Sequence, residues 1–192
     1  MIILNCENRV IKISSDQDFS IDIRKQNKKY NHIYTLSNSV NGEDFATKYS
    51  IVIEDQNNQM IDNAIVIADN AGIASPQMDS AVIKDDAIIL VIGMYIVALD
   101  INTLSMLWFL TTENCYACFS IHSVGNRFIA YCEGSIIGIR RDGSLEWEFT
   151  GRDIFVSVNG FTPFELNDEW IDLVDFENNK YRIGFDGSII QG

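Results

Sequence analysis

The second half of the chain repeats itself, and this repeat leaves few folds open. Three segments share one order of features: polar turn residues, an apolar strand, a short connector, a second strand and a tight turn. The segments are 85–124, 125–166 and 167–192. Asp142-Gly143 and Asp186-Gly187 occupy the tight turn of the last two segments, and an Asp-Gly pair between apolar runs is a strong signal for a two-residue hairpin. The repeat therefore predicts a series of antiparallel hairpins.

A repeat of about 40 residues built from antiparallel strands is typical of β-propeller blades, each of which is a four-stranded sheet. Two stretches near the ends of the first two segments, CYACFSIHSV and DIFVSVNGF, are expected to form additional strands. The apolar residues are mainly Ile, Val, Phe and Tyr, which favour strands. We therefore predict an all-β chain of about four or five propeller-like blades of antiparallel strands.

The pattern of the N-terminal third predicts further strands, followed by a hairpin around Gln56-Asn57-Asn58. These strands are expected in MIILN, RVIKIS, FSIDI and HIYTL. One domain is expected over 1–192, with an internal boundary near 71–80. A closed ring needs at least four blades, and an incomplete ring exposes sheet edges and apolar faces. Three ways of covering the open end remain: the N-terminal third completes the array, it forms a cap, or a second copy of the chain makes a homo-oligomer.

One stretch carries a longer motif, ALDINTLSMLW from Ala98 to Trp108. It resembles the tryptophan-docking motif of the PQQ-type (quinoprotein-like) β-propeller family, A-x-D-x-x-T-G-x-x-x-W. Four residues match that motif: Ala98, Asp100, Thr103 and Trp108. Leu104 departs from it, because the family has glycine there. The resemblance implies that the Asp and Thr brace a turn between strands and that the Trp packs against the neighbouring blade.

The resemblance covers about half of the chain, from Ser80 to Gly192, and weakens along it. The second repeat has a shortened motif that ends in Trp147, and the third has Ile189 and Ile190 in place of the tryptophan. Family members that bind the quinone use about eight blades of this repeat length. Because this chain supplies neither that number nor the calcium-binding carboxylates, we expect a cofactor-free array.

Charge narrows the choice of partners. The net charge of −13 disfavours nucleic acid and anionic membranes. It has two interpretations: the charge keeps the protein in solution, or it attracts a protein partner of basic character. No apolar run approaches the length of a membrane-spanning helix, and the N-terminus lacks the pattern of a signal peptide. These features predict a cytoplasmic protein in which all four cysteines are reduced thiols.

Cys115-x-x-Cys118, with His122 nearby in the sequence, is the candidate for metal or redox chemistry. Its flanks read as strand, where residues three apart point to opposite faces. We therefore expect these cysteines to be buried structural residues and no metal to be bound. His122 is expected to be a packed side chain of a strand.

Acidic residues gather in NDEWIDLVDFEN. Asp168 and Glu169 are expected in a turn, and Asp172 and Asp175 on the polar face of a strand. Trp170 beside them is a candidate for an exposed aromatic anchor, because such residues dominate protein interfaces. These five residues are the predicted binding site.

Besides a metal-dependent protein that uses Cys115, Cys118 and His122, two hypotheses of function remain open. The first is a non-enzymatic protein-binding or scaffold module, of which an immunity-type protein for a basic toxin is the sharper form. The alternative is an enzyme acting on a carbohydrate or other small molecule, with Asp172 and Asp175 as facing carboxylates.

Overall fold

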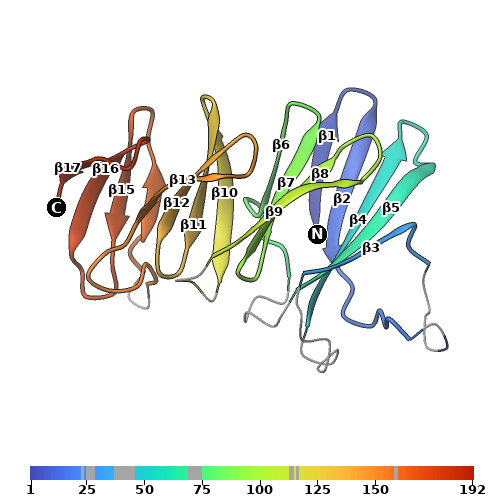
Figure 1. The fold of residues 1–192 in the computed structure, drawn as a ribbon, viewed down its shortest axis with the longest axis horizontal. Helices are drawn as coiled ribbons and strands as arrows, with labels where there is room; N and C mark the ends of the chain where they lie inside the picture. Colours follow the sequence, from blue (N-terminus) through green and yellow to red (C-terminus); the bar gives the residue numbers. More distant parts are fainter. Residues whose placement is uncertain are drawn as a thin grey trace.

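The computed structural model describes residues 1–22, 24, 29–36, 46–68, 75–112, 115, 117–157 and 160–192. These residues form four β-sheets that stand side by side in a row (Figure 1). The first sheet has the order β1-β2-β4-β5-β3 and is antiparallel except for β3, which runs parallel to β5. Its strands are β1 (Ile2–Cys6), β2 (Arg9–Ser15), β3 (His32–Thr35), β4 (Thr47–Asp55) and β5 (Met60–Ala68).

The other three sheets are antiparallel, and each has four strands in sequence order. The second sheet holds β6 (Ala81–Lys84), β7 (Ala87–Ile92), β8 (Tyr95–Asp100) and β9 (Met106–Thr111). The third holds β10 (Cys118–Val124), β11 (Arg127–Cys132), β12 (Ile136–Arg140) and β13 (Leu145–Phe149). The fourth holds β14 (Phe164–Leu166), β15 (Trp170–Val174), β16 (Lys180–Gly184) and β17 (Ile189–Gln191).

This architecture confirms the prediction of an all-β chain of about four or five propeller-like blades, since the described residues form four sheets. The first and fourth sheets lie at opposite ends of the longest axis, so the row is open (Figure 1). Each of the last three sheets begins one strand before the corresponding repeat of the sequence. CYACFSIHSV supplies β10, the first strand of the third sheet, as expected. The expected strand in DIFVSVNGF is wrong for its described residues, because the fourth sheet begins only at Phe164. Of the expected boundary at 71–80, residues 71–74 lie outside the described part.

The core consists of three layers of side chains between neighbouring sheets. One layer joins the first and second sheets, one the second and third, and one the third and fourth. The two inner sheets are covered on both faces, and β7 and β8 are accordingly continuous apolar runs with nearly every residue buried. In β15 of the fourth sheet only alternate residues are buried, as expected for a strand covered on one face.

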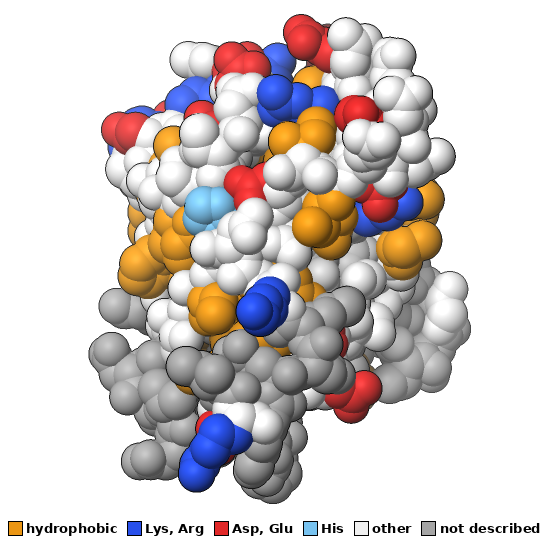
Figure 2. Space-filling view, turned by 90° about the vertical axis from the view of Figure 1, so that its right-hand side faces the viewer, with side chains coloured by type: hydrophobic (Ala, Val, Ile, Leu, Met, Phe, Trp, Pro, Cys, Tyr) orange, Lys and Arg blue, Asp and Glu red, His pale blue; other side chains and the backbone are white. Residues whose placement is uncertain are grey.

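The outward face of the first sheet is covered by the chain that follows β2. Phe19 is buried there against Ile65 and Ile67, and Ile21 and Tyr30 pack around them. The view onto this end of the row shows hydrophobic side chains in separate patches divided by charged ones (Figure 2). The part of the chain before β4 therefore both supplies strands and caps the row. Among the described residues, no helix is long and apolar enough to cross a membrane.

Each sheet has two tight turns at the same edge of the row, drawn at the top of Figure 1. We call this edge the turn edge. It holds the turns that connect β1 to β2, β4 to β5, β6 to β7, β8 to β9, β10 to β11, β12 to β13, β14 to β15 and β16 to β17. Because consecutive antiparallel strands alternate in direction, every first-to-second and third-to-fourth strand connection falls on this side.

Candidate functional site

Two tryptophans of the motif lie at the junctions between sheets. Trp108 of β9 packs into the layer between the second and third sheets, and Trp147 of β13 into the layer between the third and fourth. A Cβ added to Gly143 would lie 2.5 Å from the ring of Trp108, and one added to Gly187 would lie 2.7 Å from the ring of Trp147. Both glycines have positive φ, so the turn of each following sheet presses its bare backbone onto an indole.

A small residue lies opposite each of these indoles. Ala98 pairs with Trp108 across β8 and β9, and Gly138 pairs with Trp147 across β12 and β13. A Cβ on Gly138 would clash with the ring of Trp147. The indole Nε1 of Trp147 also donates a hydrogen bond of 2.9 Å to the carbonyl of Phe185 in the fourth sheet. The small residue, the indole and the glycine of the next turn are therefore stacked in one line.

The side chain of Asp100 organises the turn after β8. Its Oδ1 accepts hydrogen bonds from the backbone amides of Asn102 and Thr103 and from the hydroxyl of Thr103. Partial burial alone would raise the pKa of Asp100, but these hydrogen bonds outweigh it and hold that pKa below its usual value. The carboxylate thus stays charged and braces the turn.

The structure also gives a reason for the departure at Leu104. This residue has the positive φ of the motif glycine but is fully buried against the first sheet. The first sheet presents Tyr34 at this junction, and the Tyr34 hydroxyl donates a 2.8 Å hydrogen bond to the Leu104 carbonyl. No indole presses on the turn here, so a leucine side chain fills the space.

The fourth sheet lacks this docking apparatus. The positions of Ala98 and Gly138 are taken by Arg182, and those of Trp108 and Trp147 by Gln191, because Arg182 and Gln191 are paired across β16 and β17. The expectation that Ile189 and Ile190 replace the tryptophan is therefore wrong. All three sheets have the same register irregularity, and Gln191 follows Gly187 by the same four residues as Trp147 follows Gly143. The outward face of this sheet therefore carries the Arg182 and Gln191 side chains where the second and third sheets have a small residue and an indole.

That outward face carries a connected polar cluster. Asp172 accepts hydrogen bonds from Arg182 (2.7 and 3.1 Å), from the Trp170 indole (3.0 Å) and from Asn167 (3.1 Å). The Arg182 guanidinium lies over the Trp170 ring, 4.5 Å from its centroid. The Arg182 hydrogen bond holds the pKa of Asp172 below its usual value. Trp170 is half-buried beneath Arg182 rather than bare.

Asp175 belongs to a different environment. It is fully buried, and it accepts hydrogen bonds from Asn179 and from the Tyr181 hydroxyl (2.8 Å). Its expected place on a solvated polar face is therefore wrong, because the chain turns inward after β15. Burial would raise the pKa of Asp175, but the hydrogen bonds from Asn179, Tyr181 and the backbone together lower it.

Replacing Asp175 by asparagine should lower the free energy of unfolding by about 1–3 kcal/mol at neutral pH, because an amide NH₂ would face the donors of Asn179 and Tyr181. The folded-state pKa of Asp175 is lowered, so its stabilising contribution is present above the unfolded pKa of about 4 and is lost as pH falls through the folded value. Urea unfolding between about pH 7 and about pH 3 should show this loss in the wild type and a smaller one in the variant. Equal pH dependence of the two proteins would contradict this role.

The remaining predicted binding residues lie on the turn edge. Asp168 and Glu169 form the turn between β14 and β15, and both are exposed. Exposed acidic side chains also mark other turns of this edge, among them Glu7 between β1 and β2 and Asp86 between β6 and β7. The structure therefore places Asp168, Glu169 and Trp170 at one corner of a largely acidic edge.

Arginines bridge neighbouring sheets along the same edge, and no sequence motif predicted these contacts. Arg9 at the start of β2 donates 3.0 Å to the carbonyl of Ile101 in the second sheet. Arg127, at the equivalent start of β11, donates 2.6 Å to the carbonyl of Phe185 in the fourth sheet. Ala87 holds this position in the second sheet. Only a comparison of the sheets in register shows that the two arginines are equivalent.

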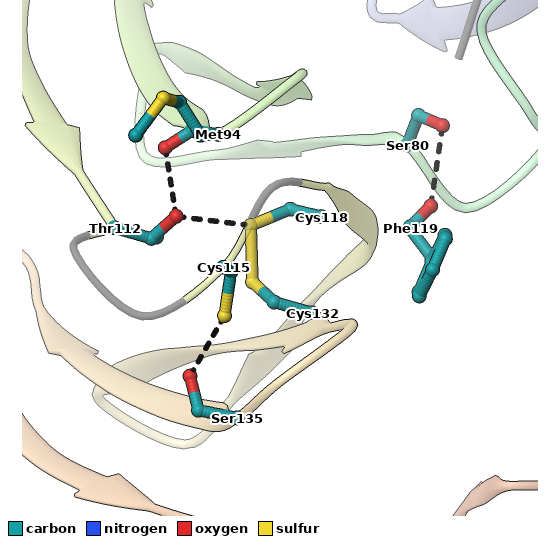
Figure 3. Close-up of a disulfide and its surroundings, with 8 residues drawn as sticks. All are labelled: Ser80, Met94, Thr112, Cys115, Cys118, Phe119, Cys132 and Ser135. Carbon is teal, nitrogen blue, oxygen red and sulfur yellow. Dashed lines mark hydrogen bonds between the residues drawn. A yellow bond between two sulfur atoms is a disulfide. The ribbon is translucent and has the colours of Figure 1, made fainter. Parts of the chain in front are cut away.

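The cysteines correct one expectation. Cys118 and Cys132 face each other on β10 and β11 and form a disulfide, so two of the four cysteines are not reduced thiols (Figure 3). Cys118 is therefore not available as a metal ligand. Cys115 is a buried free thiol that contacts the Ser135 hydroxyl at 3.1 Å.

His122 lies on β10, and its described contacts are with residues other than the cysteines. Its Nε2 hydrogen-bonds the Ser120 hydroxyl at 2.8 Å, and its ring stacks on Phe164 at 5.3 Å. Burial lowers the pKa of His122. Among the described residues, no group of three His, Cys, Asp or Glu side chains is arranged to hold a metal ion.

Comparison with known proteins supports the fold. No protein-family model matches the chain, and no curated protein matches it. The structure of BamB from Moraxella catarrhalis, a β-propeller, is similar to 74% of this chain with a TM-score of 0.50 and 14% sequence identity. The chain spans 42% of the BamB chain. The computationally designed Ika4 protein is similar over 95% of this chain and 89% of its own, with a TM-score of 0.55 and 12% identity. At these identities the likeness concerns the fold alone.

Proposed function

We propose that this chain is a non-enzymatic protein-binding module whose turn edge receives a partner of basic character. The observation that carries the proposal is the exposure of acidic side chains on turns of several sheets at this one edge, including Glu7, Asp86, Asp168 and Glu169. A net charge of −13 would speed the encounter with a positively charged protein. An immunity-type protein that neutralises a basic toxin is the sharper form of this proposal.

The corner at the β14–β15 turn is the proposed anchor of the interface. Trp170 and Arg182 are stacked there, and tryptophan and arginine are the residue types enriched at interface hot spots. Asp172 holds both side chains by hydrogen bonds, so the stack is ordered before binding. A preordered anchor loses less side-chain entropy when a partner arrives.

The geometry gives less support to the carbohydrate or small-molecule enzyme. Asp172 is bound to Arg182 on the outward face of the fourth sheet, whereas Asp175 is buried against Asn179 and Tyr181. Glycoside hydrolysis needs a carboxyl group with a raised pKa to act as the acid. The pKa values of Asp172 and Asp175 are both lowered.

The proposal is tested by reversing the charge of the anchor corner. Asp168→Lys combined with Glu169→Lys should lower the affinity for a basic partner at least about tenfold, since it removes two attractive charges and adds two repulsive ones. Bait carrying the wild-type chain should capture the partner from source-cell extract, and calorimetry with the recovered protein should then measure the affinity. Binding should weaken as salt rises from about 50 to about 300 mM.

Asp18→Lys combined with Glu177→Lys is the matched control, because both residues are exposed at the edge opposite the turns. It makes the same change of net charge and should leave the affinity within about twofold once long-range charge is screened. Equal loss of binding in the two double variants would refute a site at the turn edge. Failure to recover any partner at low and moderate salt would refute the proposed function itself.

A further inference from the structure

An open pocket of about 360 Å³ interrupts the acidic turn edge at the third sheet. It is lined by Asn126, Arg127, Arg140, Arg141, Asp142 and Glu146. Three of the 14 basic residues of a chain with net charge −13 thus converge on one small pocket. We infer that this pocket binds an anionic group, a phosphate or carboxylate, carried by a ligand with an adjoining apolar part. The inference is independent of the proposed protein partner.

The carboxylates at the pocket are already engaged. Glu146 forms an ion pair of 3.0 Å with Arg127, and Asp142 accepts hydrogen bonds from the amide and hydroxyl of Ser144 in its own turn. Arg141 forms an ion pair with Asp85 of the second sheet. These contacts use acceptors that would otherwise compete with an incoming anion.

N–H donors that a ligand can reach remain on Arg140. Arg140 is exposed, and its described hydrogen bond is a long one of 3.3 Å to the carbonyl of Leu145. Arg141 already donates to Asp85 and to the carbonyl of Gly125, and its unpaired Nε is buried, so it contributes positive charge rather than a free donor. A guanidinium carries five N–H donors in a planar fork that suits the oxygens of phosphate and carboxylate. Arg140 is therefore the main anion-binding group, with Arg141 beside it.

The apolar part of the ligand is inferred from the neighbouring pocket, which shares Arg141 with the first. That pocket holds about 120 Å³ and is lined in part by Leu107, Trp108 and Phe128. Leu107 is 51% exposed, which leaves its side chain free to contact a ligand. The Arg141 guanidinium lies over the Phe128 ring, so it joins the charged and apolar regions.

Titration with phenyl phosphate and with inorganic phosphate, at ionic strength matched with sodium chloride, tests the inference by NMR. We expect amide shifts that saturate around Asn126 and Arg140, with tighter binding of phenyl phosphate than of inorganic phosphate. Arg140→Gln should weaken the binding of both anions about tenfold, because it removes charged hydrogen bonds. Leu107→Ser should weaken only phenyl phosphate, down to the affinity of inorganic phosphate.

Arg152→Gln is the control, because Arg152 is also exposed and the charge change is the same, but the residue does not line the pocket. It should bind both anions like the wild type. Absence of saturable shifts at about 10 mM of either anion, or equal losses in Arg140→Gln and Arg152→Gln, would overturn the anion site. Equal affinity for the two anions would overturn the apolar part. None of these results depends on whether a basic protein binds the turn edge.

Discussion

Replacing Trp147 by alanine is expected to lower the free energy of unfolding by about 3–5 kcal/mol, the usual cost of removing a large aromatic side chain from a packed site. The indole fills the space between Gly138 of its own sheet and Gly187 of the next, and it donates a hydrogen bond to the carbonyl of Phe185. Neither glycine has a side chain that could fill the cavity. Urea denaturation followed by circular dichroism measures the loss.

The same variant should show where the row comes apart. Each sheet packs only against its neighbours, so a defect between the third and fourth sheets should loosen the fourth sheet first. Hydrogen exchange should therefore accelerate in β15 and β16 while β7 and β8 remain protected. Uniform acceleration across all four sheets would show that the row unfolds as one unit.

Trp170→Ala is the matched control for Trp147→Ala. It removes the same side chain from the outward face of the fourth sheet, where the indole contacts Arg182 and Asp172 rather than another sheet. We expect a loss of about 1 kcal/mol or less, comparable to a surface cation–π contact. Equal losses in the two variants would mean that stacking between sheets does not account for the stability of the row.

Much of the fold could be predicted because residues close together in the sequence identify each hairpin of the repeat. The Asp-Gly turns and the spacing of about 40 residues identify hairpins and blades without any knowledge of distant contacts. The strand order of the first sheet was harder to predict from the sequence, because β3 pairs in parallel with β5, about 30 residues further along the chain. Pairing between distant segments leaves no turn signature, and no local pattern marks it.

The candidate site could be predicted only in part, because local patterns do not determine which side chains meet. Asp172 and Asp175 lie close in the sequence, yet one is held by Arg182 and the other is buried under Tyr181. The structural role of Leu104 depends on its contact with Tyr34, which lies 70 residues earlier in the chain. Arg140 and Arg141 carried no motif, and their pocket exists only because the β10–β11 and β12–β13 turns meet at one edge.

Reduction of the disulfide between Cys118 and Cys132 should lower the free energy of unfolding by about 3 kcal/mol, because the bond closes a loop of 14 residues in the unfolded chain. The bond joins the edge strand β10 to its neighbour β11 in the third sheet, which packs against sheets on both sides. Urea unfolding with and without dithiothreitol measures the difference. A Cys118→Ala/Cys132→Ala variant should be insensitive to dithiothreitol, whereas Cys115→Ala should respond like the wild type, because it keeps the bond.

Alkylation of the unreduced, denatured protein separates this disulfide from the alternative of four reduced thiols. Mass spectrometry should find Cys6 and Cys115 alkylated and a peptide linked through Cys118 and Cys132. Alkylation of all four cysteines in protein isolated under non-reducing conditions would instead favour a reducing compartment, where such bonds are rare. In that case dithiothreitol should leave the unfolding curve unchanged, and the packing of two buried thiols between β10 and β11 would have to hold the strands together.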